Sequence, residues 1–277
     1  MKKVLLATTA LVLSAGFAAA DVKISGSANM GLKYDEGNLS YAAKKTAGWY
    51  EIDMDVIGTM ETDTGLTFGA RIQLDSNYAD GDQSYGAQTF VSGAFGTFTI
   101  GAVDPIADDY GLTDIGFDGI GTDNVAEDAA YTGTADARWD YTVGAVTMGV
   151  SLNTVSEDYG LGVAYDAGMF NAALTYDHED LTDNDTTSLL LGGKFDAFYG
   201  EVYVTNNDLR DTSWGIYGSY KTGALLIEAS YADADALADE AYGIGAKYDL
   251  GGGAKLAGGV GSVNGDTVAD FGVTFSF

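Results

Sequence analysis

Apolar and polar residues alternate along most of the chain after residue 21. In residues 22–34, the apolar side chains from Val22 to Leu32 fall on even positions, and polar side chains such as Lys23 and Lys33 fall on odd ones. A period of two places these sets on opposite faces of a β-strand. Helical spacing is not sustained after residue 21, so the pattern predicts an all-β protein. The same alternation occurs in residues 66–75, 146–153, 169–177, 201–205, 241–249 and 269–277.

The connections between these segments fall into two classes. Seven are tight and mostly carry glycine, as hairpin turns do, and eight are longer or more acidic. Together they predict 16 strands, and counts of 14 or 18 lie within the error of the boundaries. Short turns at one end and longer loops at the other are typical of a transmembrane antiparallel β-barrel. The tight turns are 61–65, 93–96, 144–145, 167–168, 196–197, 222–223 and 250–253; the longer connections are 35–47, 77–84, 104–135, 155–158, 178–186, 207–211, 233–240 and 263–266.

The last strand, ADFGVTFSF, ends on an aromatic residue. In a soluble protein such a strand would be an aggregation hazard, whereas in a barrel it closes the ring against the first strand and turns its Phe face to lipid. A soluble β-sandwich explains the alternation equally well, but not the terminal Phe277 or the alternating loop lengths. Aromatic residues near the strand ends predict interfacial girdles. These residues are Tyr34, Trp49, Tyr50, Tyr165, Tyr176, Tyr220, Tyr231 and Tyr248.

The first 20 residues predict a cleaved signal peptide. Lys2 and Lys3 precede an apolar stretch from Val4 to Phe17, and the segment ends in three alanines. A short apolar stretch followed by an A-x-A site is typical of export followed by cleavage. We therefore expect one barrel domain over residues 21–277.

The charge of the exported chain limits its partners. Without the two lysines of the signal peptide, 11 basic residues stand against 41 acidic ones, a formal charge of −30. Such a charge argues against binding to nucleic acid or to anionic lipid, since both require basic patches. The chain has no cysteine, which excludes disulfides and thiolate metal sites. Its 46% hydrophobic content argues against disorder.

Three segments together resemble the general bacterial porins, most closely the short porins of Rhodobacter-type α-proteobacteria. They are ADVKISGSANMGLKY at residue 20 onward, FGTFTIG before a long third outer loop, and the Phe-terminated FGVTFSF. The resemblance covers the whole mature length. It implies an outer-membrane, homotrimeric, water-filled barrel for small hydrophilic solutes, with the third loop folded into the lumen. It also implies that the strand ending in Phe277 is recognised by the barrel-assembly machinery.

The longest connection, residues 104–137, carries the candidate chemistry. It contains nine acidic residues and no base before Arg138. In the family that the chain resembles, this loop narrows the pore, so we expect an acidic constriction and modest cation selectivity. The predicted constriction residues are Asp104, Asp108, Asp109, Asp114, Asp118, Asp123 and Glu127.

The resemblance also implies a basic wall opposite this loop. Arg71 is the strongest candidate, because an arginine on the lipid face in mid-strand would cost about 2–4 kcal/mol. Arg138 follows the loop and could pair with its carboxylates. The candidates selected by strand parity are Arg71, Arg138, Lys33, Lys23, Lys194 and Lys247.

Other readings stay open at this point. Clustered carboxylates in the third loop could hold Ca²⁺, although no stretch matches an EF-hand loop. The chain has one histidine, His178, which lies among acidic residues, and no cysteine. A nucleophilic or zinc-dependent active site requires more such residues, so the composition argues against an enzyme. The main alternative to a porin is a non-channel outer-membrane barrel that acts as an adhesin or structural protein. Such a barrel would need an occluded lumen.

Overall fold

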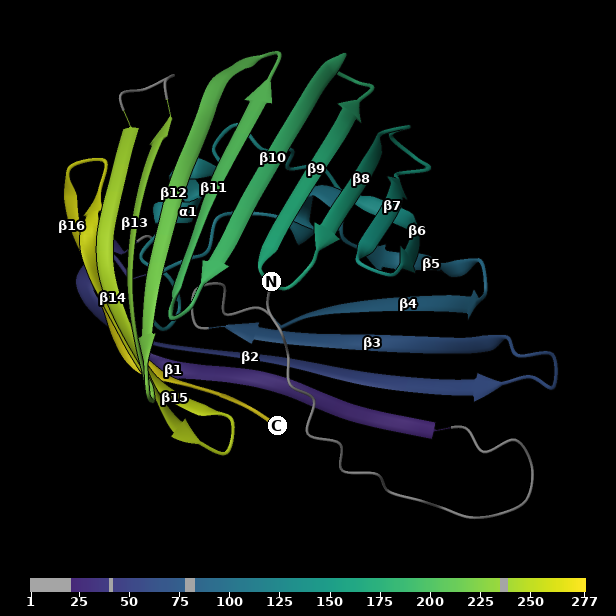
Figure 1. Cartoon of the computed structure of the whole chain (residues 1–277), viewed down its shortest axis with the longest axis horizontal. Helices are drawn as coiled ribbons and strands as arrows, with labels where there is room; N and C mark the ends of the chain where they lie inside the picture. The colour runs from purple at the N-terminus through teal and green to yellow at the C-terminus, as the bar shows by residue number, and fades with distance from the viewer. Residues whose placement is uncertain (1–20, 40–41, 78–82, 235–238) are drawn as a thin grey trace.

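The computed structural model describes residues 21–39, 42–77, 83–234 and 239–277, so the predicted signal peptide lies outside the described part. Its strands form one closed barrel in which each strand pairs with its sequence neighbours and β1 pairs with β16 (Figure 1). The prediction of 16 strands is confirmed, and ring closure rules out the sandwich. The strands are β1 (Asp21–Leu39), β2 (Lys44–Glu61), β3 (Thr67–Asn77), β4 (Gln83–Gly93), β5 (Gly96–Val103), β6 (Ala135–Val143), β7 (Val146–Leu152), β8 (Tyr159–Asp166), β9 (Phe170–Glu179), β10 (Asn184–Phe195), β11 (Phe198–Asn207), β12 (Arg210–Thr222), β13 (Leu225–Ala234), β14 (Asp239–Gly251), β15 (Ala254–Val263) and β16 (Asp266–Ser276).

The C-terminal residue takes part in barrel closure. The N–H of Phe277 donates to the carbonyl of Gly26, and the N–H of Gly26 donates back to the carbonyl of Phe277, each at 3.0 Å. Antiparallel pairing then continues along β1 and β16 as far as Asp35 and Val268. The last strand is therefore fixed to its end, because its backbone groups are paired with β1.

The seven predicted tight turns all join consecutive antiparallel strands. Two of the connections predicted to be longer are two-residue turns instead, at residues 208–209 and 264–265. Asn264 and Gly265 both have positive φ, at 54° and 88°, which suits the hairpin turns that follow the twist of the strands. These two errors concern only the length of the connections. The predicted number of strands is unaffected, because a short and a long connection both reverse the chain between two strands.

The alternating faces match the sequence pattern. Val22, Leu32 and Phe271 are more than half exposed on the outside, and the polar side chains between such residues face the interior. An apolar outer face on a closed barrel is what contact with hydrocarbon requires. The prediction that Trp49 belongs to the outer aromatic girdle is wrong. Trp49 lies on the inner face of β2, where the Lys33 ammonium is 4.5 Å from the centre of its ring.

Within the part of the chain that the structure describes, helical structure is confined to one connection, residues 104–134. It contains a 3-10 turn η1 (Ile106–Asp109) and one α-helical turn α1 (Thr122–Ala126). β6 begins at Ala135, so the connection ends at residue 134, one residue before the end of the predicted connection 104–135. Residues 127–134 form no strand, which agrees with their assignment to this loop. Among the described residues, no helix is long and apolar enough to cross a membrane.

Candidate pore constriction

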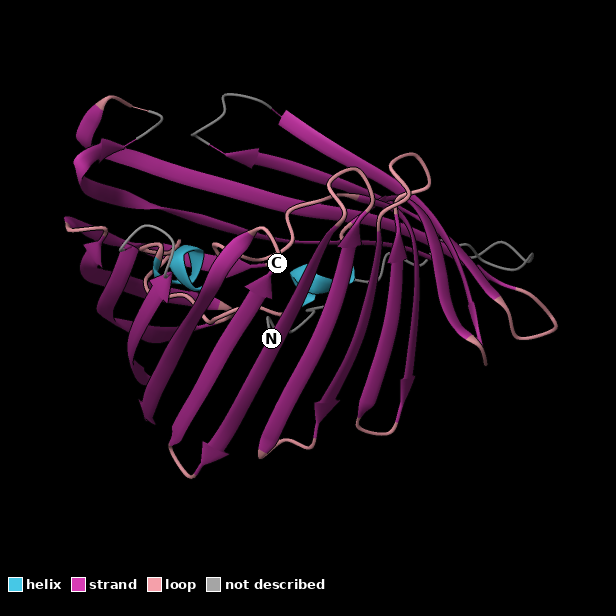
Figure 2. Ribbon diagram, turned by 90° about the horizontal axis from the view of Figure 1, so that it is seen from above, coloured by secondary structure: helices cyan, strands magenta, loops and turns pink. Residues whose placement is uncertain are grey.

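The connection from residue 104 to residue 134, here called the lumen loop, lies inside the barrel. Figure 2 shows both of its helical turns within the ring of strands. Its backbone bonds to side chains on the inner face: the Ile106 N–H donates to Ser151 Oγ at 3.1 Å, and Ser213 Oγ donates to the Ala126 carbonyl at 2.7 Å. Since β7 and β12 supply these partners, the loop is attached to the wall along much of its length.

Three carboxylates on the wall hold the tip of the loop. Asp270 Oδ2 accepts the N–H groups of Phe117 and Asp118 at 2.9 and 3.1 Å. Glu228 accepts the N–H of Gly116 at 3.2 Å, and Glu201 accepts the N–H of Thr113. Charged acceptors make stronger hydrogen bonds than neutral ones. The wall therefore uses its own acids to fix residues 113–118.

Sequence reasoning missed these wall acids. Glu201, Glu228 and Asp270 each stand singly at an inward position of a strand, and this spacing was their only signal. A single inward acid on one strand does not indicate which distant backbone it meets. The loop that it binds lies 88 to 153 residues away in the chain.

Glycines on the inner face make room for the apolar side chains of the loop. A Cβ at Gly162 would lie 2.5 Å from Ile106, and one at Gly245 would lie 2.2 Å from Ile115. Gly272 stands in the same relation to Phe117. Ile106 and Ile115 are almost completely buried. The lumen loop is thus packed against a wall whose glycines leave space for it, which increases the apolar area removed from water.

Replacing Gly162 with valine should dislodge the start of the lumen loop, since the added atoms would occupy the space of Ile106. Overpacking of this kind typically costs about 1–3 kcal/mol. We expect faster amide hydrogen exchange at residues 106–110. Gly58→Ala is the control, because nothing lies within 4 Å of its Cβ position. Equal exchange in both variants would contradict the packing role of Gly162.

The predicted constriction acids divide by their surroundings. Asp118 pairs with Lys33 at 2.6 Å, and Asp109 pairs with Arg138. Asp104 and Asp108 are exposed. The remaining three, Asp114, Asp123 and Glu127, are half-buried between the loop and the wall. The seven acids therefore share the loop but do not all face water.

Burial changes the ionisation of the half-buried loop acids, which lie outside the spanning strands. Desolvation, with a contribution from the Asp123 charge, raises the pKa of Asp114 to about 8 and that of Glu127 to about 7. Burial also raises the pKa of Asp123. Glu127 in addition accepts the N–H of Leu112 at 2.7 Å, which partly opposes the rise. The loop therefore carries less negative charge near neutral pH than its composition indicates.

Docking of the lumen loop should weaken as the pH rises. The folded pKa values of Asp114 and Glu127 lie above those of a free chain, so the folded loop holds these protons more tightly. The resulting stability is complete below about pH 4 and is lost through pH 7 and 8. We expect exchange at residues 111–127 to rise between pH 6 and 9 by more than the intrinsic rate. In the D114N/E127Q double variant, exchange at these residues should rise with pH only as fast as the intrinsic rate. If exchange in wild type also follows the intrinsic rate, the docking of the loop is not linked to these two protons.

The predicted bases do not form a separate wall facing the loop. Lys33 and Arg138 bind the loop acids themselves, and Lys247 lies 3.2 Å from Glu228 and 3.3 Å from the Asp114 carbonyl. Lys23 and Lys194 lie near the tight-turn end, on β1 and β10. Arg71 does lie inside the barrel on β3, where its two nitrogens bind the two oxygens of Asp55 at 2.6 and 2.9 Å.

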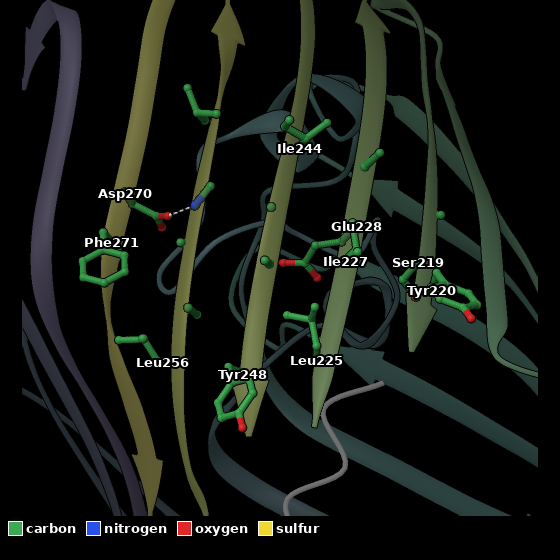
Figure 3. Close-up of a pocket in the computed structure, with 18 of the residues that line it drawn as sticks. Ser219, Tyr220, Leu225, Ile227, Glu228, Ile244, Tyr248, Leu256, Asp270 and Phe271 are labelled. Atoms are coloured by element: carbon green, nitrogen blue, oxygen red, sulfur yellow. Dashed lines mark hydrogen bonds between the residues drawn. The ribbon is translucent and has the colours of Figure 1, made fainter. Parts of the chain in front are cut away.

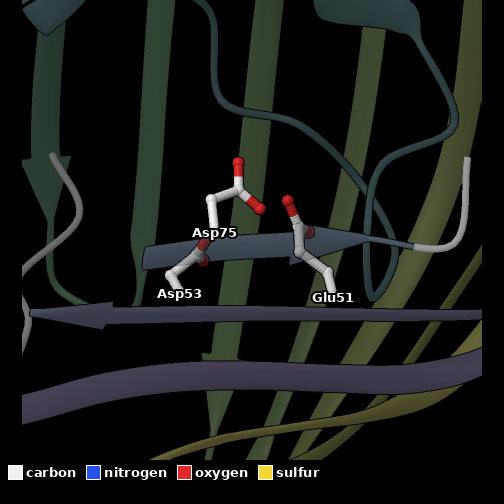
Figure 4. Close-up of side chains that lie close together, drawn as sticks. All are labelled: Glu51, Asp53 and Asp75. Carbon is white, nitrogen blue, oxygen red and sulfur yellow. The ribbon is translucent and has the colours of Figure 1, made fainter. Parts of the chain in front are cut away.

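The inner face around Arg71 is acidic, opposite in sign to the expected basic wall. Glu51, Asp53 and Asp75 point from β2 and β3 toward one another, and they are here called the acidic wall cluster (Figure 4). One carboxylate oxygen of each lies within 4.8 Å of the others. Among the described residues, no other three acidic, histidine or cysteine side chains bring their ligand atoms this close together. The acids of the lumen loop, which were considered for Ca²⁺, therefore do not form a group of this kind. The signal in the sequence was the alternation of Glu51, Asp53 and Asp55 with apolar residues.

An antiparallel barrel of 16 strands with an apolar outer face and a loop folded inside defines an outer-membrane β-barrel of the pore-forming class. The sequence model that describes Gram-negative porins matches residues 7–268. The chain belongs to the Gram-negative porin family.

Individual relatives agree with this assignment. The porin of Fuscovulum blasticum is 30% identical over 93% of this chain and all of its own length, and the porin of Rhodobacter capsulatus is 28% identical with the same coverage. Among solved structures, a multiple mutant of the Rh. blastica porin aligns with a TM-score of 0.80 at 27% identity, covering 92% of this chain and all of that one. A second solved structure, reported for asymmetric conductivity of engineered proteins, aligns at 0.79 and 26% identity with the same coverage.

Proposed function

We propose that this protein forms a water-filled channel for passive diffusion of ions and small hydrophilic solutes. The supporting observation is a difference in exposure inside the barrel. Arg71 and Asp55 on β2 and β3 keep 31% and 28% of their side-chain surface accessible, while Glu228 and Tyr203 on the other side are almost fully covered. The lumen loop covers one wall and leaves the wall of β2 and β3 accessible to water. The aqueous path therefore runs along the acidic wall cluster.

We further propose a modest preference for cations. Lys33, Arg71, Arg138 and Lys247 each form an ion pair with a carboxylate. Around Arg71, β2 and β3 turn four carboxyl side chains inward, those of Glu51, Asp53, Asp55 and Asp75, so acids outnumber bases along this wall and the path is net negative. Field lines concentrate in a channel with low-dielectric walls and raise the local cation concentration.

The family and fold support a location in the outer membrane of a Gram-negative bacterium. We propose that residues 1–20 are removed on export and that the barrel assembles as a homotrimer. We also propose that the strand ending in Phe277 is its signal for the barrel-assembly machinery. N-terminal sequencing of outer-membrane fractions and native mass spectrometry of the detergent-solubilised protein test the first two statements, and pull-down of the assembly machinery with and without Phe277 tests the third.

Single-channel recording in a planar bilayer tests the channel directly. We expect stepwise currents from the mature protein and, under a KCl gradient, a reversal potential that favours K⁺. Currents in groups of three would accompany a trimer. No current from protein that retains its β-structure would overturn the proposal and favour the adhesin or structural role.

A further inference from the structure

Asp177 is a buried carboxylate without a partner. It lies on the inner face of β9 with none of its surface exposed, yet neither of its oxygens accepts a hydrogen bond from any described residue. Two other buried acids of the wall have partners (Figure 3): Asp270 accepts the N–H of Gly259 at 2.8 Å, the bond that the dashed line marks, and Glu228 lies 3.2 Å from the Lys247 ammonium. A buried charge is strongly unfavourable unless it is paired or coordinates a metal ion.

Two neutral oxygens beside Asp177 are unpartnered in the same way. Thr175 precedes it by two residues on the same face of β9, and Asn184 lies diagonal to it on β10, next to the Thr186 that pairs with it directly. Thr175 Oγ1 and Asn184 Oδ1 are buried and have no hydrogen-bond partner among the described residues. Positions two apart on one strand, and diagonal positions on neighbouring strands, are about 7–8 Å apart, so their side chains can reach a common ligand.

A further oxygen lies on the other side of Asp177, toward β7 and β8. A Cβ at Gly160 would lie 2.4 Å from Asp177 Oδ1 and 2.6 Å from Ser151 Oγ, so these two oxygens are at most about 5 Å apart. They form no hydrogen bond with each other, and Ser151 Oγ accepts the Ile106 N–H instead. Oxygens that share one metal ion at about 2.3–2.6 Å lie about 3.3–5 Å apart. The separation therefore suits two ligands of the same ion.

The first helical turn of the lumen loop covers these oxygens. η1 packs on β7, β8 and β9, and Ile106 at its start is almost completely buried. Asp108, on the same turn, is exposed, and its charge acts on Asp177 with the same sign. Two acids close together attract cations and repel anions. The surroundings of Asp177 therefore favour a positively charged partner.

We propose that Asp177 binds an alkali-metal cation between the wall and η1. The ligands are both of its carboxylate oxygens together with Ser151 Oγ, Thr175 Oγ1 and Asn184 Oδ1. Oxygen donors of this kind suit hard cations. A single buried carboxylate neutralises one positive charge, so a monovalent ion fits the site better than a divalent one. The ion joins the wall to the start of the lumen loop, because Ser151 contacts both the ion and the Ile106 N–H. This role does not depend on conduction.

Amide hydrogen exchange of the mature protein in detergent tests the site, at about pH 7.5 and one ionic strength, in NaCl, KCl or N-methylglucamine chloride. The organic cation is too large for a buried site, so we expect exchange at residues 106–110 to be at least about three-fold slower in an alkali salt. Asp177→Asn should remove this difference. Thr175→Val should raise the salt concentration at which half of the effect is reached. The matched control is Asp166→Asn on the same face of β8 at its tight-turn end, which should behave as wild type.

The broadening of the ²³Na NMR signal in the same samples reports binding directly, and it should be smaller in Asp177→Asn than in Asp166→Asn. Equal exchange of wild type in all three salts would overturn the site and show that a proton or water alone satisfies Asp177. A salt effect that persists in Asp177→Asn would place the ion elsewhere. If that variant does not fold, Thr175→Val decides, since a half-maximal salt concentration equal to that of wild type would contradict the site. Slower exchange on addition of micromolar Ca²⁺ in NaCl would show that a divalent ion binds instead.

Discussion

Replacing Asp53 and Asp75 with asparagine should lower the K⁺/Cl⁻ permeability ratio by about three- to ten-fold. Both side chains belong to the acidic wall cluster on the accessible side of the lumen. A carboxylate about 7 Å from the ion path contributes roughly 0.6 kcal/mol in water, and salt halves this at about 0.1 M. Two such charges act with opposite sign on K⁺ and on Cl⁻, which gives the stated range. Reversal potentials under a KCl gradient measure it.

The matched control is Asp114→Asn. Asp114 has been counted among the constriction acids, but burial raises its pKa to about 8, so it is largely neutral at pH 7. Asparagine keeps the oxygen that accepts the Ile115 N–H at 2.7 Å. We expect its permeability ratio to stay within about two-fold of wild type. A larger effect from Asp114→Asn than from the wall double variant would place selectivity on the loop and contradict this account.

Replacing Asp270 with alanine should release the tip of the lumen loop while the barrel stays closed. The side chain accepts the N–H groups of Phe117, Asp118 and Gly259, and alanine leaves these donors without their acceptor. Hydrogen bonds to a charged group contribute about 1.5–3 kcal/mol each, and water in the space left behind replaces part of this. We expect flickering single-channel currents and faster hydrogen exchange at residues 115–120.

Asp270→Asn separates the acceptor from the charge. The amide oxygen can still accept from Phe117 or Asp118, so we expect noise and exchange between those of wild type and of Asp270→Ala. The melting temperature of the β-structure should change little in either variant, because the pairing of β16 with β1 and β15 is made by the backbone. If the currents of Asp270→Ala are as steady as those of wild type, the packing of Ile106, Ile115 and Phe117 against the inner-face glycines is enough to hold the loop.

The distribution of charge in the lumen is where sequence reasoning and structure differ most. Alternation places Arg71 inside the barrel, and the same parity places Glu51, Asp53 and Asp55 there too. The alternation along a strand shows whether a side chain faces inward or outward, but it does not show which residue lies opposite across the lumen. Of the bases expected to oppose the loop, Lys33, Arg138 and Lys247 bind it instead.

The lumen loop was predictable in position but not in its attachment. Its length and acidity, together with the resemblance, predicted a long third loop inside the barrel. The apolar residues that anchor it, such as Ile106 and Ile115, have no regular spacing in a segment of mixed turns. Their partners are glycines, which in a sequence of 39 glycines give no sign of which ones face the lumen loop.

The sequence by itself determined the barrel: period-two alternation decides which face of each strand is apolar, and tight turns decide which strands are neighbours. Both are local properties, so they can be read one segment at a time. Only the tertiary structure decided which acids remain charged and accessible. That outcome depends on where the lumen loop meets the wall, through contacts such as Asp118 with Lys33 and Phe117 with Asp270. Burial and pairing are properties of residues far apart in the chain, and no local pattern specifies them.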